Sequence, residues 1–192
     1  MMHECPPAID PIRVKSHRRW HARGLIIRTF TIGRIKLRFE HLVEINDPAN
    51  PTLEPLTADQ LWQGLVLRAE SPELFMLGLD RAEIVERGDG WIERVLHFGQ
   101  ANIRDRVVFE PRRAVRYESA ATAEHAGGTL TMIIETPGPG ALLARFIYET
   151  TMPNVDASGD DRYAEIVKSA YHEADLDTVR KIREIAATGQ LG

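Results

Sequence analysis

The pattern of hydrophobic and polar positions first becomes regular at residue 37. Between Leu37 and Ile45, apolar or aromatic residues alternate with mostly charged ones. A period of two is typical of a β-strand with one face buried and one face in water. This pattern predicts a first strand whose core-facing residues are Phe39, His41, Val43 and Ile45.

The pattern then changes to the period of helices. Thr57 and Gln60 have the spacing of a capping box, in which each side chain bonds the backbone of the other residue. The box predicts a helix over Ala58–Glu70. Pro72 suits the first position of a second short helix, which we expect to end at Gly78.

Strand-like segments follow one another through the middle of the chain, separated by Gly- and Pro-rich turns. Short connections at even spacing are typical of an antiparallel meander. The six predicted strands are Arg81–Arg87, Trp91–Phe98, Asn102–Phe109, Ala114–Ser119, Thr129–Glu135 and Leu142–Thr151.

A long helix is predicted over Asp160–Thr188, which contains no Pro or Gly and is followed by Gly189 at the position of a C-cap. We expect i,i+4 ion pairs Asp177–Lys181 and Arg180–Glu184 on its outer face. At 1.5 Å per residue the helix would be about 40 Å long and would need a sheet to lie against. Its predicted buried stripe is Tyr163, Ile166, Val167, Ala170, Tyr171, Ala174, Val179, Ile182 and Ile185.

This order of elements predicts an α+β, helix-grip fold. A seven-stranded antiparallel sheet would wrap around the long C-terminal helix, and two short helices after the first strand would close one end. We expect one domain over residues 37–192, preceded by a basic, disordered extension over residues 1–36. Two other interpretations of these residues are an organelle-targeting peptide and a nucleic-acid-binding tail.

Charge and cysteine content narrow the functional classes. The chain has a net charge of -4, but residues 1–38 hold nine Arg and Lys, so the predicted domain is acidic and no nucleic-acid partner is expected for it. Cys5 is the only cysteine, which fits a cytoplasmic protein. No apolar run is long enough for a membrane span. His17 and His21 lack a third ligand nearby, so no metal site is predicted.

Polar residues on strand faces that should point inward are the candidates for chemistry. The alternation places Arg94 and Asp105 inward on adjacent strands, nearly opposite one another across the turn at Gln100. One interpretation is a buried ion pair in which each charge requires the other. The second is an anchor for a carboxylate or carbonyl group of a ligand, bound by the planar guanidinium.

Three tyrosines and one histidine should also face the interior. Alternation places Tyr117 and Tyr148 inward, and Tyr171 would reach the same space from the long helix. Tyrosines in such positions serve either as core residues or as proton donors. His41 is likewise either a core histidine or a group that transfers protons.

Several stretches of the sequence resemble a known family. They are FEHLVEIND (39–47), LWQGLVLRA (61–69), ELFMLGLD (73–80), GGTLTMIIE (127–135), RFIYE (145–149) and KSAYHEADLDTVRKIRE (168–184). Together they resemble the AtaL-like family of the SRPBCC superfamily, which includes START domains and pollen allergens. The resemblance runs from about Leu37 to the C-terminus and implies a helix-grip fold with a deep apolar ligand cavity. It supplies no catalytic residues.

Three functions remain open. The first is binding of a hydrophobic small molecule, polyketide-, lipid- or aromatic-like, with His41, Arg94, Asp105, Tyr117, Tyr148 and Tyr171 as the candidate ligand-binding residues. The second is a polyketide cyclase or dehydratase that uses the same cavity, with His41, Asp105 or a tyrosine transferring the proton. The third is a protein-interaction module. The sequence has no nucleotide or dinucleotide motif, so no cofactor is expected.

Overall fold

The computed structural model describes residues 34–50, 52, 54–122, 127–153 and 162–191. The first strand begins at Arg34, three residues earlier than the alternation predicts. The rest of the expected extension lies outside the described residues, as do the histidines at 17 and 21.

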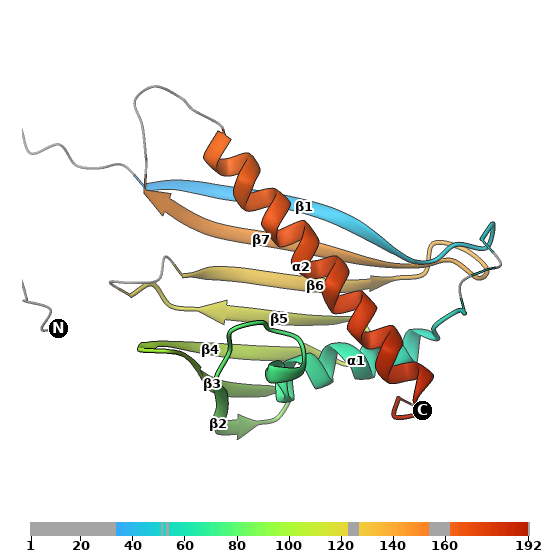
Figure 1. Ribbon diagram of the computed structural model, residues 1–192, viewed down its shortest axis with the longest axis horizontal. Helices are drawn as coiled ribbons and strands as arrows, with labels where there is room; N and C mark the ends of the chain where they lie inside the picture. Colours follow the sequence, from blue (N-terminus) through green and yellow to red (C-terminus); the bar gives the residue numbers. More distant parts are fainter. Residues whose placement is uncertain (1–33, 51, 53, 123–126, 154–161, 192) are drawn as a thin grey trace, which may run out of the picture. The chain divides into compact units, whose positions relative to one another are not determined.

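Seven strands form one antiparallel sheet in the order β1-β7-β6-β5-β4-β3-β2, and α2 crosses the face that also carries α1 (Figure 1). The predicted α+β class and helix-grip order are confirmed. Strands β2 to β7 form the meander, and β1 pairs with β7 at one edge. The elements are β1 (Arg34–Asn46), α1 (Ala58–Glu70), η1 (Pro72–Leu74), β2 (Arg81–Gly88), β3 (Trp91–Phe98), β4 (Ala101–Glu110), β5 (Ala114–Ser119), β6 (Gly128–Glu135), β7 (Leu142–Pro153) and α2 (Arg162–Ala187).

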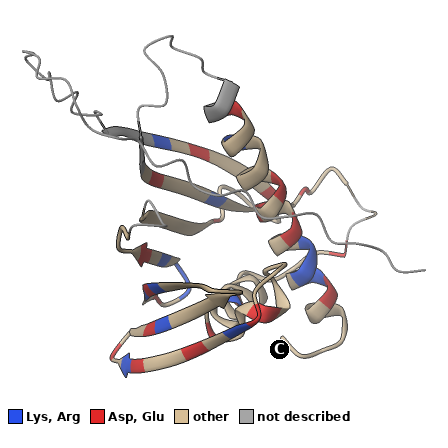
Figure 2. Ribbon diagram, turned by 60° about the vertical axis from the view of Figure 1, so that its left-hand side comes forward, with Lys and Arg blue, Asp and Glu red and all other residues tan. Residues whose placement is uncertain are grey.

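Alternation along the strands decides which side chains face the helices. In β3 the side chains of Ile92, Arg94 and Leu96 are buried, whereas those between them are partly exposed. Charged residues of both signs are spaced along the strands (Figure 2). On the outer face Arg145 contacts both Glu135 and Glu40, at 2.6 and 3.0 Å. The inner face therefore carries the core, and any interior site must lie on it.

Helix α1 starts at the predicted capping box. The Thr57 hydroxyl accepts a hydrogen bond from the backbone N–H of Gln60 at 3.0 Å, and the Gln60 side chain accepts one from the Thr57 N–H at 2.9 Å. The predicted second helix is instead a single 3₁₀ turn, η1. The bond from Phe75 N–H to the Pro72 carbonyl closes this turn, and one such turn is too short to propagate an α-helix.

Helix α2 ends as predicted, with Gly189 at φ +75°, but its buried stripe differs from the prediction. Ile166 is 66% exposed, and Ala170 and Ala174 are exposed as well. Val179 and Ile182 are buried as predicted, and Asp175 and Thr178, which the prediction omitted, are buried as well. Ile166 and Ala170 are exposed because, at about 100° per residue, they lie on the far side of the helix from buried Ile182.

The predicted i,i+4 ion pairs on α2 are wrong. The pairs are Asp177–Arg180 and Lys181–Glu184, both at i,i+3. Residues three and four apart are both neighbours on a helix surface, so the sequence alone does not choose between the two pairings.

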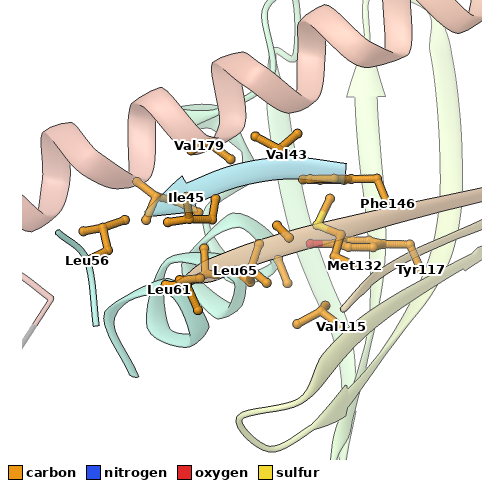
Figure 3. Packing of buried hydrophobic residues seen from close by; sticks show 14 of the residues in the cluster. Val43, Ile45, Leu56, Leu61, Leu65, Val115, Tyr117, Met132, Phe146 and Val179 are labelled. Carbon is orange, nitrogen blue, oxygen red and sulfur yellow. The ribbon is translucent and has the colours of Figure 1, made fainter. Parts of the chain in front are cut away.

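The apolar core lies where α1, the C-terminal half of α2 and the inner face of the sheet meet (Figure 3). Leu61 and Leu65 of α1 pack against Ile45, Val115 and Met132 of the sheet. Among the described residues, neither helix is apolar enough over sufficient length to cross a bilayer.

Candidate functional site

Three aromatic rings stack where β1, β7 and α2 meet. Phe39 and Tyr148 are register partners on β1 and β7, and their ring centroids lie 4.8 Å apart. The ring of Tyr171 on α2 lies 4.4 Å from that of Tyr148. Phe39 and Tyr171 are only half-buried, whereas Tyr148 is buried. The stack therefore offers partly accessible aromatic faces on the inner side of the sheet.

A buried carboxyl group lies beside this stack. The Tyr148 hydroxyl donates to both carboxylate oxygens of Asp175, at 2.7 and 2.8 Å. Nε2 of His41 lies 2.9 Å from Oδ2 of Asp175, but it makes no aligned hydrogen bond to any described residue. Asp175 is 1% exposed and His41 is 17% exposed. His41 therefore connects a fully buried acid with accessible space.

Burial raises the pKa of the Asp175 carboxyl to about 7, although the hydrogen bond from Tyr148 and the charge of Arg68 act against it. Burial, followed by the charge of Asp175, also raises the pKa of Tyr148 far above its usual value. The pKa of His41 is lowered by burial and then by His172, whose ring meets it edge-on at 4.8 Å. Near neutral pH the site therefore contains a neutral imidazole and a carboxyl group in the middle of its titration.

Arg68 and Tyr117 form a second polar group on the same face. The guanidinium carbon of Arg68, on α1, lies 5.1 Å from the centroid of the Tyr117 ring. Nε of Arg68 donates to the Thr178 hydroxyl on α2 at 3.3 Å. Burial acts to lower the pKa of Arg68, but the oxygens of Tyr117, Tyr148 and Asp175 raise it overall, so the guanidinium stays charged.

Arg94 and Asp105 lie opposite one another and point inward, as the alternation predicts. Nε and Nη2 of Arg94 donate to the two oxygens of Asp105 at 2.9 and 2.5 Å. Nη1 donates to the Ala69 carbonyl at 2.6 Å, in the last turn of α1, where carbonyls lack helical partners. This geometry favours the structural interpretation, since every group of the pair is engaged. Its ligand-anchoring role stays a prediction.

The six predicted site residues thus divide into two sets. His41, Tyr148 and Tyr171 come together around Asp175, while Arg94 and Asp105 form a separate pair close to the Tyr117 ring. The sequence analysis missed Asp175, His172 and Arg68. The available signal was positional, because Asp175 lies four residues after Tyr171 and four before Val179, on the buried face of α2.

No group of three or more metal-ligating side chains occurs in the part of the chain that the structure describes. An open groove of about 460 Å³ lies outside the sheet, along α1 and the C-terminal residues. It contains none of the six predicted site residues. Its lining is Trp62, Gln63, Val66, Leu67, Glu70, Gln190 and Leu191.

Comparison with solved structures supports the same architecture. The Zhui aromatase/cyclase from Streptomyces sp. R1128 matches with a TM-score of 0.56 at 17% identity, over 80% of this chain and 94% of that one. Norcoclaurine synthase from Thalictrum flavum matches with a TM-score of 0.55 at 12% identity, over 93% and 99% of the two chains. The allergen Ara h 8.0201 matches with a TM-score of 0.53 at 12% identity, over 77% and 97%. At these identities the likeness concerns the fold.

No curated protein matches the sequence. The family model described as acetylaranotin biosynthesis cluster protein L, AtaL, matches residues 43–189, which include both helices and all strands after the first. The matched range includes Tyr148 and Tyr171 of the aromatic stack, as well as Asp175 and Arg68, whereas Phe39 and His41 precede it. The chain therefore belongs to the AtaL family.

Proposed function

We propose that the protein binds a hydrophobic small molecule against the inner face of its sheet, beneath the N-terminal half of α2. The observation that carries this proposal is the stack of Phe39, Tyr148 and Tyr171, in which all three rings contact one another and Phe39 and Tyr171 are only half-buried. Aromatic faces of this kind bind planar apolar molecules by stacking and by burial of their area. The AtaL membership and the cyclase, synthase and allergen neighbours support the same class of ligand.

The uneven burial of α2 supports the position of this ligand. In the C-terminal half of α2 the side chains of Val179 and Ile182 are buried, whereas Val167 and Tyr171, on the same side of its N-terminal half, are only half-buried. Half-buried Leu130 lies between Tyr117 and Tyr148 in the register of β5, β6 and β7. This part of the inner face therefore has apolar surface that the described side chains do not cover completely.

Titration with the neutral fluorophore N-phenyl-1-naphthylamine tests binding. We expect a fluorescence increase that saturates, and affinity that falls about fivefold or more in Tyr171→Ala, because aromatic stacking contributes about 0.5–1.5 kcal/mol beyond the buried area. Val66→Ala, in the outer groove, is the control and should leave the affinity unchanged. A fluorophore that fails to bind, or that responds to Val66→Ala alone, contradicts the proposal.

A second candidate function is proton-transfer catalysis of the cyclase or dehydratase type. The contact of Nε2 of His41 with Oδ2 of Asp175 favours it, because burial has brought the pKa of this carboxyl to about 7. A proton shared between Oδ2 and Nε2 would leave Nδ1 of His41 to take a proton from a bound carbonyl compound or return it. Asp175 thereby replaces Asp105 as the candidate acid, since both oxygens of Asp105 are engaged by Arg94.

Exchange of the methyl protons of 2-acetonaphthone in D₂O, followed by NMR, separates the two functions. An enzyme of this type should accelerate the exchange, and His41→Gln and Asp175→Asn should abolish the acceleration while fluorophore affinity changes by less than about twofold. Binding of the fluorophore without accelerated exchange would assign the site to a carrier. The interaction-module hypothesis depends on residues 1–36 and stays a prediction, as does the cytoplasmic location.

A further inference from the structure

The hydroxyl of Tyr117 is a buried polar group of the inner face that makes no aligned hydrogen bond within the described part of the chain. Tyr117 is 7% exposed, and its hydroxyl oxygen has no hydrogen-bond partner among the described residues. A buried polar group without a partner destabilises the fold, because its lost hydration is not replaced. Such an atom is well suited to donate to a ligand that is absent from the structure.

Arg68 is a second group of the inner face that lacks a direct charged partner among the described residues. The charge of Arg94 is neutralised by Asp105. Among the described residues, the Arg68 guanidinium interacts with the neutral hydroxyls of Thr178 and Tyr117, and no carboxylate forms an ion pair with it. The carboxyl of Asp175 acts on Arg68 only from further away. One cationic group therefore lies half-buried on this face with no carboxylate in direct contact.

The position of the two groups fits one end of the proposed ligand. Tyr117, Leu130 and Tyr148 are register partners on β5, β6 and β7. Because neighbouring strands lie about 4.8 Å apart, Tyr117 and Tyr148 are about 10 Å apart across Leu130. A fused aromatic ring lying on Leu130 can reach the rings of Tyr148 and Tyr171 at one end and Arg68 with Tyr117 at the other.

We infer that the ligand is an aromatic carboxylic acid whose carboxylate is bound by the Arg68 guanidinium and accepts a hydrogen bond from the Tyr117 hydroxyl. This inference rests on the proposed function and specifies the ligand class for the same site. Arginine binds carboxylates through two parallel N–H donors, and charge-assisted bonds of this kind are about twice as strong as neutral ones. Arg68 and Tyr117 thus act as specificity-determining residues, whereas the aromatic stack supplies apolar contact.

Competition between two matched ligands tests the inference. Bound N-phenyl-1-naphthylamine is displaced from the full chain by 2-naphthoate or by 2-naphthamide at about pH 6, where the naphthoate is ionised and Asp175 retains its proton. We expect 2-naphthoate to displace the fluorophore at about tenfold lower concentration than the amide. The preference should be lost in Arg68→Gln and reduced in Tyr117→Phe. It should persist in Arg87→Gln, which removes an exposed arginine paired with Glu70.

The outcomes separate the two proposals. If the fluorophore does not bind, both the proposed function and this inference are wrong. If it binds but the acid and the amide compete equally, or if the preference survives in both Arg68→Gln and Tyr117→Phe, the inference alone is overturned. Thermal unfolding of Tyr117→Phe supplies an independent check. Because the hydroxyl makes no aligned hydrogen bond to any described residue, its removal should not lower the melting temperature, and a clear decrease would contradict the inference.

Discussion

Asp175 is the residue on which the chemistry of the site depends. Its carboxyl is 1% exposed and lies between the Tyr148 hydroxyl and the His41 imidazole. Burial favours its neutral form, and this reverses the usual contribution of a carboxylate to stability. An aspartate with a lowered pKa stabilises the fold as pH rises, whereas one with a raised pKa destabilises it.

The pH dependence of stability should therefore reveal Asp175. Its pKa rises from 3.8 to about 7 on folding. The stability of the wild-type protein should then decrease, relative to Asp175→Asn, by up to about 4 kcal/mol between about pH 4 and pH 7, and no further above that. Urea unfolding at several pH values measures the difference. Asp177→Asn, on the exposed side of α2, is the control, and a flat difference for Asp175→Asn would contradict the assignment.

The buried pair Arg94–Asp105 should behave as a structural unit. Arg94→Met alone leaves the Asp105 carboxylate and the Ala69 carbonyl without their donor, at a cost of about 3–5 kcal/mol. The double variant Arg94→Met with Asp105→Leu removes both charges and should recover much of this loss. Denaturant unfolding measures the free energy of unfolding of the single and the double variant. A double variant less stable than the single one would contradict a purely structural role.

Residue-level prediction from the sequence succeeded on the strands and only in part on the long helix. Alternation has a strict period of two, so it located Arg94 opposite Asp105 and placed Tyr117 and Tyr148 inward. On α2 the predicted stripe counted apolar residues only. It therefore omitted Asp175 and Thr178, which are buried because a hydroxyl and a guanidinium on other elements are available as partners.

At the scale of elements, the contact between α1 and α2 fixes the position of the long helix. Gly64 of α1 faces Ile182 of α2, and a Cβ atom at Gly64 would lie 2.6 Å from Cγ2 of Ile182. At the end of α2, Arg183 donates to the carbonyls of Ile45 and Glu54. The C-terminal half of α2 is therefore attached to both α1 and β1.

Gly64→Ala should destabilise the protein although alanine is the better helix former. The added methyl group overlaps Ile182, and we expect a loss of about 1–3 kcal/mol, larger than the gain of about 1 kcal/mol from helix propensity. Combining it with Ile182→Ala should cost less than the sum of the two single changes, because space becomes available. Thermal or urea unfolding of the wild type, the two single variants and the double variant measures the interaction energy between the two positions. Strictly additive losses of stability would show that the helices do not meet there.

Element order was almost fully predictable, because Thr57 with Gln60 forms the capping box and the turns between strands contain Gly and Pro. Two features were not. The single 3₁₀ turn at Pro72–Leu74 has the same start signal as an α-helix. The pairing of β1 with β7 joins strands about a hundred residues apart, and local patterns carry no information about such a contact.

At the scale of the whole domain, the sheet carries two different surfaces on its inner side. Where α1 and the C-terminal half of α2 cover it, the residues form a closed apolar core (Figure 3). Towards the N-terminal half of α2, the aromatic stack and Leu130 are only partly covered. Stability and ligand binding are therefore assigned to opposite ends of the same face.

The central claim is that an aromatic ligand binds on the inner face of the sheet, beside Asp175. The most direct measurement is the change in backbone amide NMR shifts of ¹⁵N-labelled protein as N-phenyl-1-naphthylamine is added. We expect the largest changes in β1 near Phe39, in β7 near Tyr148 and in α2 between Tyr171 and Asp175. Changes confined to the outer groove along Trp62 and Leu191, or no changes at saturating fluorophore, would contradict the claim.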